Sequence, residues 1–160
     1  MFEIPVRVYY QDTDAGGVVF HSTYLDFMER ARTEWLRVKG FESADLARGI
    51  GLLFIVRRLE VAYLAPARLD DLLAVSTGVA ELGRAQMTFA QSVRRGDDTL
   101  VRASINVACV TAEGLQPAPI PAAIRAVLKS ESGKIANEDS EGAATPFAPR
   151  LRIRDKISQL

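Results

Sequence analysis

Hydrophobic residues recur along this chain with two periods, which predict one long helix and several strands. Over residues 22–39 the apolar positions lie three or four apart, as on the buried face of an amphipathic helix. These positions are Tyr24, Phe27, Met28, Ala31, Trp35 and Val38. Lys39 and Gly40 suit the end of that helix, because a cation and then a glycine are favoured there. We expect a shorter helix over 43–48, with Ser43 as its N-cap.

Alternating apolar and polar residues predict strands on both sides of these helices. Residues 2–10 are rich in valine and tyrosine and form the first predicted strand. The later strands are predicted at residues 53–64, 72–82, 85–95 and 99–111. Gly83 and the segment Gly96-Asp97-Asp98 are typical of the tight turns between the last three. One strand, one long helix and four more strands indicate an α+β fold, in which an antiparallel sheet packs on a helix.

The chain has room for one domain, which we place at residues 1–130. A short helix over 121–130 is expected to end it, following three prolines. Residues 131–160 are enriched in Glu, Ser, Gly, Asn and Pro, and we predict that they form a flexible C-terminal tail. The basic, partly apolar end of that tail suits either a solvated terminus or a contact with a partner or membrane surface.

Composition excludes several classes of function. The chain has 20 Lys and Arg and 20 Asp and Glu residues, so it lacks the excess positive charge expected of a nucleic-acid-binding protein. It contains one cysteine, Cys109, and one histidine, His21, which are too few for an intrachain disulfide or a Cys/His zinc site. The first residues do not resemble a signal peptide, and we expect a cytoplasmic protein.

The densest group of reactive side chains lies in residues 9–25, between the first strand and the long helix. Asp12 and Asp14 can each act as a general base or a nucleophile, and a histidine can orient a carbonyl or a water. Backbone N–H groups of the glycine-containing loop and of the helix start can stabilise an oxyanion. Acyl transfer is therefore possible here without a metal or cofactor.

Each of these residues also has a structural interpretation. The two aspartates suit turn and capping positions, His21 suits a cap or a core edge, and Tyr10 and Tyr24 suit packing. Other motifs do not fit: a calcium loop that began at Asp12 would have Gly16 at its fifth position and Thr23 at its twelfth, where acidic ligands are expected, and no G-x-S-x-G nucleophile elbow is present. The residues alone do not choose between Asp12 and Asp14.

The segment resembles the signature of the 4-hydroxybenzoyl-CoA thioesterase family, and most closely its YbgC-like, Tol-Pal-associated acyl-CoA thioesterase branch. The resemblance rests on Y-Y-Q-D-T-D-A-G-G-V-V-F-H-S-T-Y-L, E-R-A-R, R-R-L-E-V-A-Y-L-A-P-A-R-L-D-D-L-L and G-R-A-Q-M-T-F-A-Q. It covers about residues 5–130. It implies a hotdog fold, in which a five-stranded antiparallel sheet wraps around one long helix, and dimers or tetramers with active sites at the subunit interface.

The resemblance also implies roles for particular residues. Asp14 is implied to be the key carboxylate, accompanied by Tyr10 and His21. The thioester oxygen is expected at the backbone N–H groups near Gly17 and Val18. Basic side chains are expected to bind the phosphates of CoA, and Tyr24 is a further candidate for substrate contact. The candidates for phosphate binding are Arg57, Arg58 and Arg84, although surface ion pairing is the commoner role of such residues.

The expected activity is hydrolysis of acyl thioesters of CoA or of acyl carrier protein, with no metal and no cofactor. Phe20 and Thr23 stand where relatives commonly have Tyr and Asn, which leaves the acyl preference open. Two alternatives stay open: a non-catalytic acyl-carrier or envelope-complex adaptor, and a hotdog dehydratase. The branch further implies association with Tol-Pal or lipid-synthesis proteins, and a peripheral position at the inner membrane is compatible with that.

Overall fold

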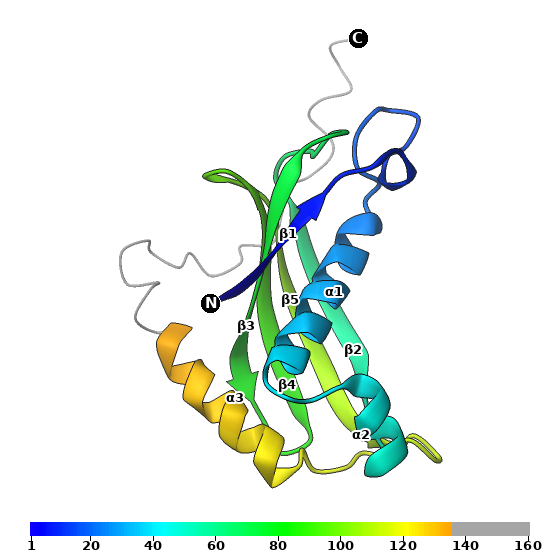
Figure 1. The fold of residues 1–160 in the computed structure, drawn as a ribbon, viewed down its shortest axis with the longest axis vertical. Coiled ribbons are helices and arrows are strands. Elements are labelled where there is room, and N and C mark those ends of the chain that lie inside the picture. Colours follow the sequence, from blue (N-terminus) through cyan, green and yellow to red (C-terminus); the bar gives the residue numbers. More distant parts are fainter. Residues whose placement is uncertain (136–160) are drawn as a thin grey trace, which may run out of the picture.

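In the computed structural model, which describes residues 1–135, a curved antiparallel sheet wraps around one long helix (Figure 1). Helix α1 spans Thr23–Val38. The strands are β1 Phe2–Arg7, β2 Leu52–Tyr63, β3 Leu72–Leu82, β4 Gln86–Arg95 and β5 Asp98–Thr111. Their order in the sheet is β1-β3-β4-β5-β2, so β1 and β2 are the edge strands. This arrangement confirms the predicted α+β class and the five-stranded hotdog fold.

The buried face of α1 fills the concave side of the sheet. Phe27, Met28, Ala31 and Trp35 are buried, and Trp35 meets Phe89 of β4 edge to face with ring centroids 5.7 Å apart. Burial of this apolar surface is the main force that holds helix and sheet together. The positions were predicted from the helical spacing alone.

The last turn of α1 corrects that prediction at one position. Val38 is exposed, and Leu36 is buried in its place. Helix α2, Ser43–Gly49, contacts α1, and Leu46 of α2 belongs to the same core cluster as Leu36. The chain folds back after α1, so that α2 packs against the last turn of α1. The side of α1 that faces α2 is therefore the buried side at this end. Ser43 is the first helical residue and Glu42 is the N-cap, so the predicted Ser43 cap was wrong.

A second long helix packs along β3. Helix α3, Ala122–Ile135, contacts β3 and lies beside it in Figure 1. Its Ile124 and Leu128 are buried against the core. The helix continues past residue 130, where the sequence placed the start of the tail, and residues 136–160 of the predicted tail lie outside the described part of the chain. None of the helices within residues 1–135 is long and apolar enough to cross a bilayer.

Two local irregularities set the course of the strands. Gly96, with φ of +56°, occupies the two-residue turn that joins β4 to β5, where a left-handed conformation favours glycine. In β2 the register with β5 shifts between Val56 and Arg58. A bulge of this kind adds a residue to one strand and increases its twist. The predicted first strand was too long: β1 ends at Arg7 and a 3₁₀ turn occupies Tyr10–Asp12.

Candidate active site

The segment that was predicted to carry the chemistry forms the connection between β1 and α1, at one end of the sheet (Figure 1). It is tied to the connection between β2 and β3: the Val19 N–H donates to the Ala67 carbonyl at 2.9 Å, and Val18 forms an isolated bridge with Arg68. The segment is therefore held on a second part of the chain that is about fifty residues away in sequence.

The two aspartates of this segment have different environments. Asp12 is buried, with 6% of its surface exposed, and its Oδ2 accepts the Tyr9 backbone N–H at 2.8 Å. Asp14 is exposed. One of its carboxylate oxygens, Oδ1, accepts the Gly16 N–H at 2.7 Å. Asp12 therefore closes the 3₁₀ turn, whereas Asp14 presents a carboxylate to solvent.

The loop around Asp14 is a tight turn. The Asp14 carbonyl accepts the Gly17 N–H at 3.0 Å, and the Asp14 N–H donates to the Val18 carbonyl at 3.0 Å. Gly17 has φ of +72°, a conformation that side chains other than glycine rarely adopt. The Gly17 N–H is thus engaged inside the turn, while the Val18 N–H donates no hydrogen bond within residues 1–135. Of the two predicted oxyanion donors, Val18 is the one that is available as the loop stands.

His21 and Tyr10 both lie on the surface of this end of the molecule. His21 directly precedes Ser22, the N-cap of α1, and its ring lies 4.3 Å from the Phe20 ring, between centroids. Tyr10 is 82% exposed. The structure therefore brings Asp14, His21 and Tyr10 to one loop region, but the chain alone does not enclose them.

Tyr24 and Tyr63 form hydrogen bonds to the backbone at this end of the molecule. Tyr24 is only 2% exposed, its hydroxyl accepts the Ala67 N–H at 2.8 Å, and burial raises the pKa of that hydroxyl. Its place in the core leaves little of it to contact a substrate, contrary to our expectation. Tyr63, at the end of β2, donates from its hydroxyl to the His21 carbonyl at 2.8 Å. Sequence reasoning included Tyr63 in a family-like stretch but did not single it out.

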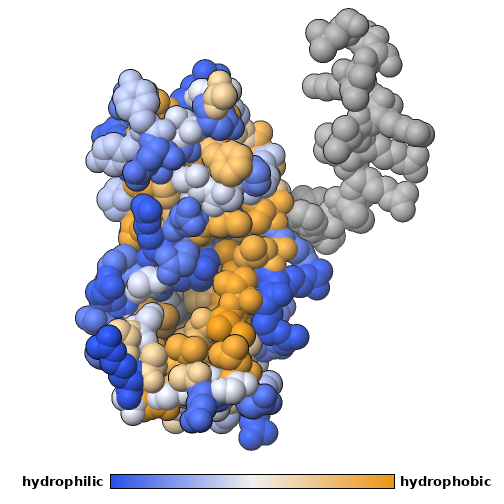
Figure 2. Space-filling model, turned by 90° about the vertical axis from the view of Figure 1, so that its right-hand side faces the viewer, coloured by the Kyte–Doolittle hydropathy of each residue, from blue (hydrophilic) through white to orange (hydrophobic). Residues whose placement is uncertain are grey.

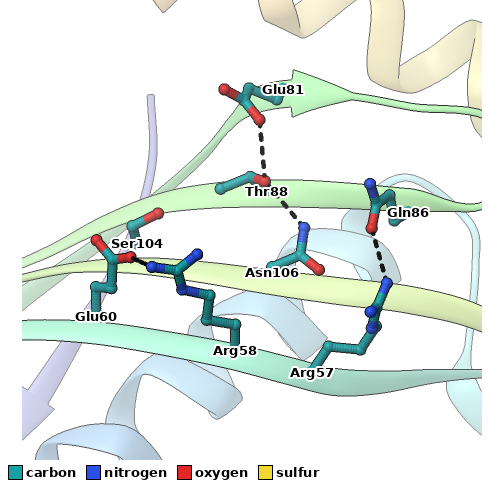
Figure 3. A pocket seen from close by; sticks show the side chains of 8 residues that line it. All are labelled: Arg57, Arg58, Glu60, Glu81, Gln86, Thr88, Ser104 and Asn106. Carbon is teal, nitrogen blue, oxygen red and sulfur yellow. Dashed lines mark hydrogen bonds and ion pairs between the residues drawn. The ribbon is translucent and has the colours of Figure 1, made fainter.

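The three candidate arginines lie along the outer face of the sheet. A polar depression of about 680 Å³ contains Arg57 and Arg58 (Figure 3). Its other lining residues are Glu60, Glu81, Gln86, Thr88, Ser104 and Asn106. Arg58 forms an ion pair with Glu60, and Arg57 donates to Gln86 Oε1 at 3.2 Å. The side chains of this depression largely satisfy one another.

A neighbouring depression of about 610 Å³ is mainly apolar and contains Arg57 and Arg84. Its apolar lining residues are Ile55, Ala85, Ala108, Val110, Leu115 and Pro117. Neither arginine has an acidic partner within residues 1–135. Two uncompensated guanidinium groups beside an apolar surface suit a ligand that has both an anionic and an apolar part.

Arg84 does not lie near Asp14 in the same chain. Leu72, at the start of β3, pairs with Arg7 beside the Asp14 loop, and the strand then runs to the other end of the sheet, where Arg84 follows. The structure thus separates the predicted phosphate-binding residues from the predicted catalytic ones. Residues 1–135 contain no group of three or more His, Cys, Asp and Glu side chains that could hold a metal ion.

The β2 edge carries an exposed apolar surface. Figure 2 views the side of the molecule that bears β2, α1 and α2, and apolar residues form a band along it with a hollow in the middle. Exposed apolar side chains of β2 and the residue after it are Val56, Leu59, Tyr63 and Leu64. Within the described residues β2 pairs only with β5, so the backbone N–H and C=O groups on its other side are unpaired.

Comparisons with known proteins agree with this fold. A match to the Thioesterase superfamily covers residues 16–102. The acyl-CoA thioesterase YbgC of Haemophilus influenzae is 46% identical over 125 residues, which is 78% of this chain and 92% of that protein. The acyl-CoA thioester hydrolase YbgC of Escherichia coli O6:H1 is 43% identical over 131 residues, covering 81% and 96% of the two chains.

A solved structure gives the same result. The probable thioesterase from Bartonella henselae aligns with a TM-score of 0.72 and 38% identity, over 74% of this chain and 98% of that one. The match to the family includes the Gly16–Gly17 turn, the whole of α1 and the strands from β2 to β4. With this match and relatives of 43–46% identity along most of their length, the chain belongs to the thioesterase superfamily.

Proposed function

We propose that this protein is an acyl-CoA thioesterase that uses Asp14 to hydrolyse acyl thioesters to a free acid and a thiol, without a metal. One observation carries the choice of residue: of the two aspartates in the loop, only Asp14 presents its carboxylate to solvent. The names of the YbgC relatives support the substrate class.

The reaction needs a nucleophile, a proton acceptor and an oxyanion partner. Asp14 either removes a proton from water as the water attacks the carbonyl carbon, or attacks that carbon itself to form an anhydride that water then cleaves. In both routes the carbon–sulfur bond breaks and the sulfur leaves as a thiolate that takes up a proton. The Val18 N–H supplies a donor for the developing oxyanion, and Gly17 supplies a second if its bond to the Asp14 carbonyl opens.

His21 and Tyr10 complete the proposed site. His21 positions the carbonyl or the water from the start of α1, where the partial positive charge of the helix N-terminus also favours an oxyanion. Tyr10 supports the pocket through its hydroxyl. Both side chains are exposed in one chain, so a further wall is required to shield the bound thioester from bulk solvent.

We propose that a second copy of the chain supplies this wall by pairing along β2. A 12-residue edge strand with unpaired backbone groups and exposed apolar side chains favours pairing with another strand. Antiparallel pairing of two β2 strands places the Leu52 end of one beside the Tyr63 end of the other. In such a dimer the partner's Arg57 and Arg84 lie toward the end of the combined sheet that carries Asp14.

In this arrangement we expect the arginines to bind the phosphates of CoA. Arg57 and Arg84 have no acidic partner within residues 1–135, whereas Arg58 is already paired with Glu60. We therefore expect Arg57 and Arg84 to contribute more to CoA binding than Arg58. The cytoplasmic location and the association with Tol-Pal or lipid-synthesis proteins stay predictions from the family resemblance.

The Asp14→Asn protein tests the proposal. The amide keeps an oxygen that can accept the Gly16 N–H, so the turn is retained while the carboxylate is lost. Purified wild type and mutant are incubated with short, long and aromatic acyl-CoAs, and free thiol is followed over time. We expect the mutant to be slower by about a hundredfold or more. Asp45→Asn, an exposed change on α2, is the matched control and retains full activity.

Other outcomes identify the alternatives. A folded wild type that releases no thiol from any acyl-CoA contradicts the CoA-thioesterase proposal and favours carrier-protein substrates or an adaptor role. Addition of water to an enoyl-CoA without thiol release favours the dehydratase. An Asp14→Asn protein with wild-type activity contradicts the assignment of the carboxylate.

A further inference from the structure

A tyrosine on the edge strand is bonded to the backbone of the proposed site. The Tyr63 hydroxyl donates to the His21 carbonyl oxygen at 2.8 Å, across 42 positions of sequence. Tyr63 is the last residue of β2, and His21 directly precedes the N-cap of α1. The contact therefore joins the edge of the sheet to the point where the loop enters the helix.

The hydroxyl is held by rigid neighbours. Tyr63 pairs with buried Val101 of β5, and its ring meets the Tyr24 ring at 5.8 Å with the planes at 63°. Tyr24 is itself fixed in the core, and its hydroxyl accepts the Ala67 N–H. Tyr63 is nevertheless 48% exposed. Burial of the ring therefore stabilises the fold only partly. The specific interaction of this side chain is the hydrogen bond from its hydroxyl to the His21 carbonyl.

The bond fixes the backbone from which the His21 ring projects. On one side the Phe20 N–H donates to the Asp12 carbonyl at 2.9 Å, and on the other the Tyr63 hydroxyl binds the His21 carbonyl. The peptide that follows His21 leads into the first turn of α1, where the Thr23 N–H donates to the Phe20 carbonyl at 3.0 Å. Loss of the Tyr63 bond frees this peptide to rotate and widens the range of positions of the imidazole.

We propose that Tyr63 is a positioning residue, which orients His21 and the start of α1 without touching the thioester. This proposal rests on the proposed function, because the orientation of His21 matters for catalysis only if thioester hydrolysis takes place at this site. It also links the site to the β2 edge, since the same strand presents Leu59 and Val56 to solvent. A strand that pairs with a second copy thereby holds the His21 backbone at its end.

Tyr63→Phe removes the hydroxyl and keeps the ring. Loss of one hydrogen bond that orients a reacting group predicts a kcat about tenfold lower, with KM changed by less than about twofold, because substrate contacts are untouched. The melting temperature is expected to stay close to that of wild type. Tyr9→Phe is the matched control: Tyr9 is also an exposed tyrosine, and its hydroxyl makes no hydrogen bond within residues 1–135.

A second readout does not depend on catalysis. His21 is the only histidine in the chain, so its ring protons give a single set of NMR signals that is assigned without ambiguity. We expect Tyr63→Phe to shift or broaden these signals, and Tyr9→Phe to leave them unchanged. Unchanged His21 signals in Tyr63→Phe overturn the proposal, as does a kcat equal to that of wild type or a loss no larger than in Tyr9→Phe.

The two hypotheses fail in different ways. A wild type that cleaves no thioester contradicts the proposed function, and the NMR comparison then still decides whether Tyr63 orients His21. An active wild type with an equally active Tyr63→Phe protein overturns the positioning role alone.

Discussion

At the residue scale, burial separates two aspartates that the sequence presents as equivalent. Asp12 and Asp14 stand two positions apart in the same turn-forming segment. Asp12 faces inward and accepts the Tyr9 N–H, whereas Asp14 faces solvent and binds only within its own turn. A carboxylate whose oxygen satisfies a partly buried backbone donor stabilises the fold, and one that keeps an oxygen free is available for chemistry.

The two environments predict different effects of mutation on the free energy of unfolding. Asp12→Ala leaves the Tyr9 N–H without its partner and is expected to lower the free energy of unfolding by about 1–3 kcal/mol. Asp14→Asn is expected to leave that free energy within about 0.5 kcal/mol of wild type, as for most exposed substitutions. Urea unfolding followed by circular dichroism measures both. Equal stabilities of the two mutants contradict the structural role assigned to Asp12.

At the element scale, the connection between β2 and β3 holds the site loop in place. Asp71 lies in it and accepts the Arg68 N–H and the Arg95 guanidinium, each at 2.8 Å. The Asp71 carbonyl also accepts the Val8 N–H that follows β1. Burial of the Asp71 carboxyl opposes its ionisation, but these two hydrogen bonds and the charge of Arg95 together lower its pKa below 3.8.

A lowered pKa makes the contribution of Asp71 dependent on pH. Because the folded value lies below the unfolded one, the stabilisation is complete above about pH 4 to 5 and is lost as the pH falls through the folded value. We expect Asp71→Asn to lower the melting temperature at pH 7 by a few degrees and to have a smaller effect near pH 3. Thermal melts at both pH values test this, with Asp97→Asn in the exposed β4–β5 turn as the control. An equal decrease at both pH values contradicts the electrostatic explanation.

At the scale of the whole molecule, the β2 edge decides whether the site is complete. We expect the wild type to be at least a dimer and Leu59→Arg to be a monomer, because a charge on the exposed edge opposes strand pairing. Leu59 is 42% exposed, so the substitution fits the single chain. Light scattering measures the molecular mass. The rate of thioester hydrolysis is expected to decrease as the fraction of dimer decreases.

Leu72→Arg is the matched control, because Leu72 is also exposed but lies on β3, which is paired on both sides. It is expected to remain oligomeric and active. A monomeric wild type with full activity, or a Leu59→Arg protein that remains dimeric, contradicts the proposed β2 interface.

The sequence by itself determined the elements and the fold class. Apolar residues that recur with a period of 3.6 or of 2 residues predicted the boundaries of α1 and of the five strands to within a few residues. Local periodicity reflects which side chains face the core. The same pattern predicted the buried residues of α1 except at Val38, where the return of the chain to α2 changed which side is covered. The family resemblance pointed to Asp14, Tyr10 and His21, which the structure brings to one loop region.

Only the tertiary structure decided how distant segments meet. It placed Asp12 inside and Asp14 outside, engaged the Gly17 N–H within its turn, and buried Tyr24. It brought Tyr63 to the His21 carbonyl and left β2 as an edge with an exposed apolar band. These features depend on contacts between residues that are far apart in the chain, and periodicity along one segment carries no information about which other segment will cover it.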